Sequence, residues 1–101
     1  MHYDIIIVTK NEIDETCLTN LNYLHLHDGL VTHGKVNSNT YDYLIIDQIY
    51  PDLNLVTEDG KIITNQFLKT SDEQIYAIGA INNSNKENQL QIIIDDIKNP
   101  F

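Results

Sequence analysis

Cysteine, basic residues and long apolar runs are all scarce in this chain of 101 residues. The single cysteine excludes both an intrachain disulfide and a paired redox-active thiol site. Six basic residues against fifteen acidic ones leave a net charge of −9, which argues against binding to nucleic acid or to an anionic membrane surface. No apolar run approaches the roughly 20 residues that a membrane-spanning helix needs. The opening residues lack the pattern of a signal peptide, so we expect a cytoplasmic protein.

Apolar residues, by contrast, are plentiful and gather in short runs. They make up 42% of the chain, enough for one core, and we expect residues 1–101 to form a single domain. Residues 3–8 read YDIIIV, a pattern typical of a strand that is buried on both faces. Residues 41–47 (YDYLIID) and 75–79 (IYAIG) follow the same pattern, so we predict three buried strands.

Two segments carry the signature of a helix. Residues 9–12 follow the capping-box pattern T-x-x-E and precede apolar residues at three- and four-residue spacing up to residue 21. Cys17 belongs to that apolar face, so we expect it to fill core space. Residues 84–87 follow the related pattern S-x-x-E, and the helix after them should end before Pro100. We therefore predict two flanking helices.

The segments between these elements have the two-residue period and the turn residues of antiparallel strands. Asp28-Gly29 separates residues 23–26 from residues 30–36 and predicts a hairpin turn. A second turn at residues 58–60 leads into a short strand at 61–64. The whole pattern predicts an α/β layered sandwich with a partly parallel central sheet, an antiparallel β-ribbon and two flanking helices.

Several segments resemble, in their order, parts of a known domain. Residues 59–64 (DGKIIT), 69–71 (KTS) and 75–79 (IYAIG) are similar to the closing segment of the FAD domain in thioredoxin reductases and related pyridine nucleotide–disulfide oxidoreductases. Residues 3–8 resemble the opening strand of that domain, and residues 41–46 resemble the strand before its A-T-G turn. The resemblance implies a shortened relative of the FAD domain.

The residues that hold FAD in that family are replaced in this chain. The family's opening strand runs into G-x-G-x-x-G, where the backbone reaches the pyrophosphate, but the turn here reads VTKNEI. Ala80 stands where the family has an acidic residue that binds the ribityl chain, and residues 47–49 replace A-T-G. We expect Thr9, Lys10, Gly79 and Ala80 to mark a remnant pocket that no longer holds a cofactor.

These replacements favour a protein with no catalytic residues that acts as a binding or oligomerisation module. A small sheet often covers its exposed edge by dimerising, so we expect a homodimer or another protein partner. The alternative is an oxidoreductase that binds FAD or another nucleotide, or a subunit of one. It would use the strand end at residues 75–80 and the helix start near Ser84 to present backbone N–H groups to the cofactor.

Three histidines raise the question of a metal site. His25 and His27 share one face of a predicted strand, and His33 lies where a hairpin would bring it towards them. Three imidazoles suit zinc, but the alternation with leucine favours solvent-facing histidines, and a clear fourth ligand is missing. We therefore predict no metal site.

Two further sets of polar residues have a simpler explanation than catalysis. Ser71 or Ser84 can be combined with a histidine and an aspartate on paper, but no G-x-S-x-G elbow supports a catalytic triad. Asp95 and Asp96 are adjacent in the last predicted helix, and we expect both to face solvent.

Overall fold

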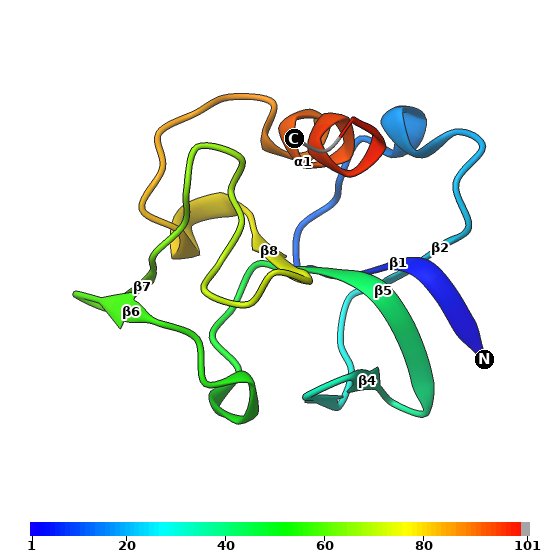
Figure 1. Ribbon diagram of the computed structural model, residues 1–101, viewed down its shortest axis with the longest axis horizontal. Helices are drawn as coiled ribbons and strands as arrows, with labels where there is room; N and C mark the ends of the chain where they lie inside the picture. Colours follow the sequence, from blue (N-terminus) through cyan, green and yellow to red (C-terminus); the bar gives the residue numbers. More distant parts are fainter. Residues whose placement is uncertain (100–101) are drawn as a thin grey trace.

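Four parallel strands form the centre of the molecule (Figure 1). The computed structural model describes residues 1–99. Strands β1 (His2–Val8), β2 (Tyr23–Leu26), β5 (Asn39–Ile46) and β8 (Ile75–Ala77) lie in the order β2-β1-β5-β8, each parallel to its neighbour. Because all four run the same way, their carboxyl ends meet at one edge of the sheet, where ligands bind in open α/β folds.

Shorter elements extend this sheet and surround it. Strands β3 (Val31–Thr32) and β4 (Lys35–Val36) form a hairpin whose second strand pairs antiparallel with the start of β5, so the sheet is mixed. Strands β6 (Thr57–Glu58) and β7 (Lys61–Ile62) form a separate two-stranded sheet. The helical elements are α1 (Gln89–Lys98) and the 3-10 turns η1 (Glu15–Leu18), η2 (Pro51–Leu53) and η3 (Gly79–Ile81).

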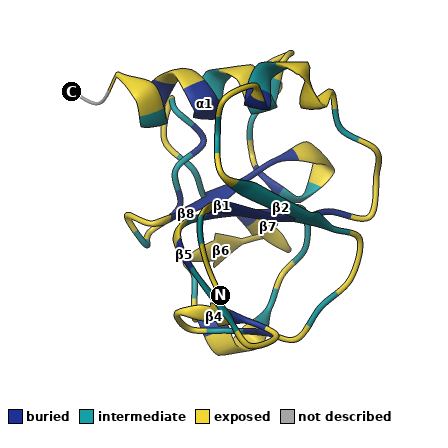
Figure 2. Ribbon diagram, turned by 90° about the vertical axis from the view of Figure 1, so that its right-hand side faces the viewer, coloured by how far each residue is buried: buried dark blue, intermediate teal, exposed yellow. Residues whose placement is uncertain are grey.

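The core lies on both faces of the parallel strands, and for this reason residues 5–8 of β1 and 44–46 of β5 are apolar without interruption. Ile5 and Ile7 pack on the face that α1 covers, together with Ile93 and Ile94 of that helix (Figure 2). Ile6 and Val8 face the opposite cluster, which also receives residues from the β3–β4 hairpin. Residues 5–8 have no exposed surface, so each side of β1 is desolvated.

The structure confirms the α/β class and most of the predicted strands. The three buried runs are strands, the turn at residues 58–60 joins β6 to β7, and the predicted final helix is α1. Its prediction also referred to Pro100, which lies outside the described residues, as does the last part of the predicted domain 1–101.

The prediction of a second flanking helix is not confirmed, because the segment after β1 forms only the single turn η1 within residues 1–99. That turn is capped by Asp14, whose carboxylate accepts from the Thr16 N–H at 3.1 Å. The expected cap, Thr9, instead donates its hydroxyl to the carbonyl oxygen of Asn11 at 3.1 Å. Ser84 also starts no helix, since its hydroxyl oxygen accepts from the Lys86 N–H at 3.1 Å and α1 begins five residues later.

The prediction of a hairpin turn at Asp28-Gly29 is wrong. Strand β2 pairs parallel with β1, and the hairpin turn lies further along the chain at residues 33–34, where Gly34 has φ +87°. Parallel pairing buries Leu24 and Leu26 against the core cluster of β1 and β5. This burial depends on contacts between residues far apart in the sequence, and the local Asp-Gly pattern carries no information about such contacts.

Asp96 is also placed differently from the prediction, because it is buried in the interface between α1 and β8. The Tyr76 hydroxyl donates to Asp96 Oδ2 at 2.6 Å, and Lys69 Nζ lies 3.7 Å from the same oxygen. Lys69 also sits over the Tyr76 ring, 5.5 Å from its centre. Burial, and then the bond to Asp96, raise the pKa of Tyr76 well above its ordinary value. The three side chains tie the helix to the sheet.

Substitution of Tyr76 tests this attachment. We expect Tyr76→Phe to lower the free energy of unfolding by about 1–3 kcal/mol, because Asp96 loses a buried hydrogen-bond donor. The pKa of Tyr76 is higher in the folded protein than in the unfolded chain, so above about pH 10 the unfolded chain releases a proton that the folded protein keeps. The free energy of unfolding of the wild type should therefore fall as the pH rises above about 10. Tyr76→Phe should make that fall shallower. Urea unfolding at several alkaline pH values measures both effects.

Tyr43→Phe is the matched control, because Tyr43 neighbours Tyr76 with ring centres 6.1 Å apart and is only half-buried. We expect it to change the free energy of unfolding by less than about 0.5 kcal/mol. Equal losses in the two variants would show that the bond to Asp96 does not hold the helix.

Candidate functional site

The site lies at the carboxyl edge of the parallel strands, between the ends of β1 and β5. The chain leaves β1 to one side to form β2 and returns to the other side to form β5, so this gap is the switch point of the sheet. Lys10 follows β1 and Asp47 follows β5. The backbone N–H of Lys10 donates to Asp47 Oδ2 at 2.9 Å. A carboxylate of the protein therefore bridges the two strand ends.

The end of β8 is also closed by a side chain. Ile78 N–H donates to the carbonyl oxygen of Ile46 at 2.8 Å, which keeps the chain beside β5 up to Gly79. The Gly79 N–H then donates to Gln89 Oε1 at 2.9 Å, and the same oxygen accepts from Asn82 Nδ2 at 2.9 Å. A Cβ atom on Gly79 would lie 4.0 Å from Asp47 Cβ, so Gly79 borders the bridged gap.

Two histidines lie on the other side of Thr9: His25 in β2 and His27 directly after it. Thr9 is 1% exposed, and its Oγ1 lies 2.8 Å from His25 Nε2. Because the hydroxyl proton goes to Asn11, we assign the proton of this contact to His25 Nε2. His27 Nδ1 lies 3.2 Å from the Thr9 carbonyl oxygen, and the two imidazole rings are 4.8 Å apart. The end of β1 is thereby tied to β2.

Three of the four predicted site residues come together at this edge. Thr9 and Lys10 follow β1, and Gly79 borders Asp47. Ala80 lies exposed in η3. Sequence reasoning recognised Asp47 as part of an altered turn but assigned it no contact. It also missed Gln89, for which no local signal exists because its partner is ten residues away.

The residues at this edge do not fit an FAD pyrophosphate. Such a group needs the free N–H groups of a glycine-rich turn after the first strand. Here the Lys10 N–H is bonded to a carboxylate, and a phosphate in that place would meet the charge of Asp47. The other carboxylate oxygen, Asp47 Oδ1, is a buried atom without a hydrogen-bond partner in residues 1–99. No step of flavin chemistry follows from these residues.

A metal centre finds no support in the described part of the chain. His33 does not join His25 and His27, since its Nε2 lies 3.5 Å from Asp72 Oδ2. Among residues 1–99, no three side chains of histidine, cysteine, aspartate or glutamate are placed to hold a metal ion.

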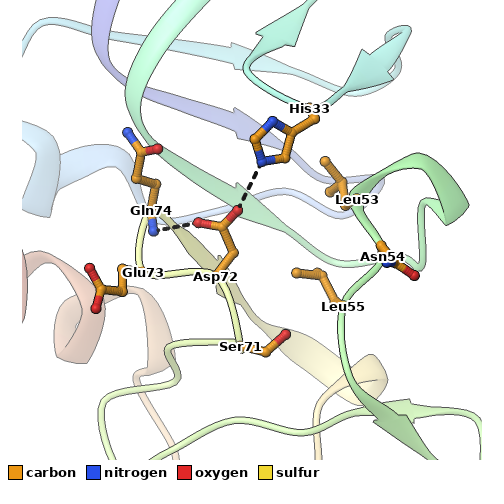
Figure 3. A pocket seen from close by; sticks show the side chains of 8 residues that line it. All are labelled: His33, Leu53, Asn54, Leu55, Ser71, Asp72, Glu73 and Gln74. Carbon is orange, nitrogen blue, oxygen red and sulfur yellow. Dashed lines mark hydrogen bonds and ion pairs between the residues drawn. The ribbon is translucent and has the colours of Figure 1, made fainter.

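A second hollow lies where residues 53–55 face residues 71–74 (Figure 3). It has a volume of about 750 Å³ and is open to solvent. Ser71, Asp72 and His33 all line it, but they form no triad. Figure 3 shows Asp72 pointing to His33, with Ser71 on the other side. The Ser71 oxygen accepts from the Val56 N–H at 3.1 Å. We refer to this hollow as the Asp72 groove.

Cys17 lines a third hollow, of about 390 Å³, between η1 and the start of α1. Its thiol donates to the Asp14 carbonyl oxygen at 3.3 Å. Burial, and then the charge of Asp14, raise the pKa of Cys17, which disfavours a reactive thiolate. Cys17 packs against the core cluster below α1, as predicted.

No family model, curated protein or solved structure matches this chain. Within residues 1–99, no helix has both the length and the apolar character needed to cross a membrane.

Substitution of Thr9 tests how the site is held together. We expect Thr9→Val to lower the free energy of unfolding by about 1–3 kcal/mol, because it removes a buried hydroxyl that bonds both His25 and Asn11. Thr57→Val, at an exposed position of β6, should change it by less than about 0.5 kcal/mol. Chemical denaturation measures both. Equal effects would mean that the hydroxyl does not fasten β1 to β2.

Proposed function

We propose that this protein is a non-catalytic α/β module, related to the FAD domain of thioredoxin reductases, that acts by binding protein. The parallel order β2-β1-β5-β8 supports the relationship, because it matches the inner four strands of the doubly wound order, without the outer strand on either side. The observation that carries the proposal is the bond from the Lys10 N–H to Asp47 across the switch point.

This bond argues against cofactor binding on energetic grounds. A hydrogen bond to an ionised carboxylate is worth more than a neutral one, about 1.5–3 kcal/mol. A pyrophosphate would have to break it and then lie close to the negative charge of Asp47. Gln89 presents the same obstacle at the Gly79 N–H. Both N–H groups that a nucleotide would use are engaged by the protein itself.

A flavin- or nucleotide-binding oxidoreductase, or a subunit of one, is the second candidate. The observation that favours it is the strand order itself, since the sheet offers a switch point in the usual place for a dinucleotide. This candidate requires Asp47 and Gln89 to release their backbone partners when the cofactor binds.

Cofactor binding separates the two candidates. We expect the purified protein to lack flavin absorbance and to show no shift in melting temperature with FAD, NADH or NADPH, because its N–H groups are engaged. A known flavoprotein treated in the same way is the positive control. Stoichiometric flavin, or a melting temperature that rises with cofactor concentration as mass action requires, would reject the non-catalytic module.

The free edge of β2 is the surface that we assign to dimerisation. Strand β2 has β1 as its one neighbour in the sheet of the described residues. Its sequence, YLHL, contains no lysine, proline or acidic residue, which are the usual guards of an edge strand. The carbonyl oxygens of Asn22 and Leu26 accept from β1. Alternation along a strand therefore directs the N–H groups of Tyr23 and His25 away from the sheet.

Hydrogen exchange tests this edge. If two copies pair through β2, the amide protons of Tyr23 and His25 should exchange more slowly as protein concentration rises, because they bond to the partner. The amide proton of Leu26, which faces β1 by the same alternation, serves as the internal control and should keep its rate. Rates at Tyr23 and His25 that do not depend on concentration would exclude a dimer through this edge.

A further inference from the structure

The Asp72 groove combines one apolar wall with one carboxylate. The apolar wall consists of the half-buried Leu55 and the small accessible part of Leu53, which is 4% exposed. Asp72 stands opposite them on the loop before β8 (Figure 3). The Asp72 side chain is 24% exposed, whereas the His33 side chain that meets it is 74% exposed. The carboxylate is thus partly desolvated, and its partner is an imidazole at the surface. No lysine lines the groove.

The charge around the groove favours a basic ligand. Glu73 is exposed and lies at its border, and the chain as a whole carries a net charge of −9. A field of this sign attracts cationic groups and repels acidic ones. The volume of about 750 Å³ is in the range of ligand pockets, but the hollow is open, which suits side chains delivered by another protein.

We propose that the Asp72 groove binds an arginine-bearing segment of a protein partner. The guanidinium group would bond to Asp72 in place of His33, and the aliphatic part of the side chain would pack on Leu53 and Leu55. Arginine fits better than lysine because its planar fork matches a carboxylate. The 101 residues contain six lysines and no arginine, so none of them can supply the guanidinium group. The inference rests on the proposed role as a protein-binding module.

A fluorescent octapeptide of alternating arginine and valine is the probe, and fluorescence anisotropy at low salt is the measurement. Wild-type protein should bind it, and a glutamine–valine peptide should not bind. Asp72→Asn should weaken binding by about tenfold or more, because the charge is lost while the oxygen that accepts from the Gln74 N–H at 2.9 Å is kept. In nuclear magnetic resonance spectra, the bound peptide should shift the amide signals of residues 53–55 and 71–74.

Asp42→Asn is the matched control. Asp42 is also a carboxylate beside a histidine, 3.1 Å from His2, but it is more exposed than Asp72 and does not line the groove. Asp42→Asn removes the same charge as Asp72→Asn, but at a residue outside the groove. We therefore expect it to alter peptide affinity by less than about twofold. Equal weakening by both variants would mean that the peptide follows net charge alone, and this result would overturn the proposal. Absence of binding to the wild type would also overturn it. Neither result bears on the proposal that the protein is a non-catalytic module. That proposal is rejected only if flavin or nucleotide binds.

Discussion

The hydrogen bond from the Lys10 N–H to the Asp47 carboxylate determines what the parallel sheet can do. It spans 2.9 Å across the gap between β1 and β5, the place where an open α/β sheet normally receives its ligand. An anionic side chain occupies the backbone donor that a phosphate would need. The Gly79 N–H is occupied in the same way by Gln89. These two bonds support the proposal that the sheet has the arrangement of a nucleotide-binding domain and that its own side chains satisfy the groups that would bind the nucleotide.

The interactions proposed above involve two other surfaces of the molecule. Neither the free edge of β2 nor the Asp72 groove uses the residues that bridge β1 and β5. The two surfaces also differ in chemistry, because the edge strand YLHL carries no acidic residue and the groove presents Asp72 and Glu73. If both proposals hold, a second copy of the chain and a basic partner protein would bind at separate sites.

Local patterns in the sequence predicted the elements whose burial is complete. The unbroken apolar runs of β1 and β5 are decisive because both faces of these strands are covered. The sequence failed where a residue has two local options and a distant partner decides between them. Thr9 can cap a helix, but His25, sixteen residues away, engages its hydroxyl. Asp96 could face solvent, but it lies in the interface below α1, where its carboxylate accepts from the Tyr76 hydroxyl. The same holds for the candidate site. Lys10 and Gly79 were predicted from the sequence. That Asp47 lies beside them could not be predicted, because it depends on the pairing of β1 with β5.

The amide resonance of Lys10 in a nuclear magnetic resonance titration tests most directly whether Asp47 engages the Lys10 N–H. If Asp47 accepts from this N–H, the Lys10 amide shift should follow the ionisation of a carboxylate as the pH is lowered, and Asp47→Asn should abolish that step. Added pyrophosphate should leave the Lys10 signal in place at neutral pH. A Lys10 amide chemical shift that is the same in the wild type and in Asp47→Asn at every pH would contradict the account. So would a shift that changes with added pyrophosphate and reaches saturation.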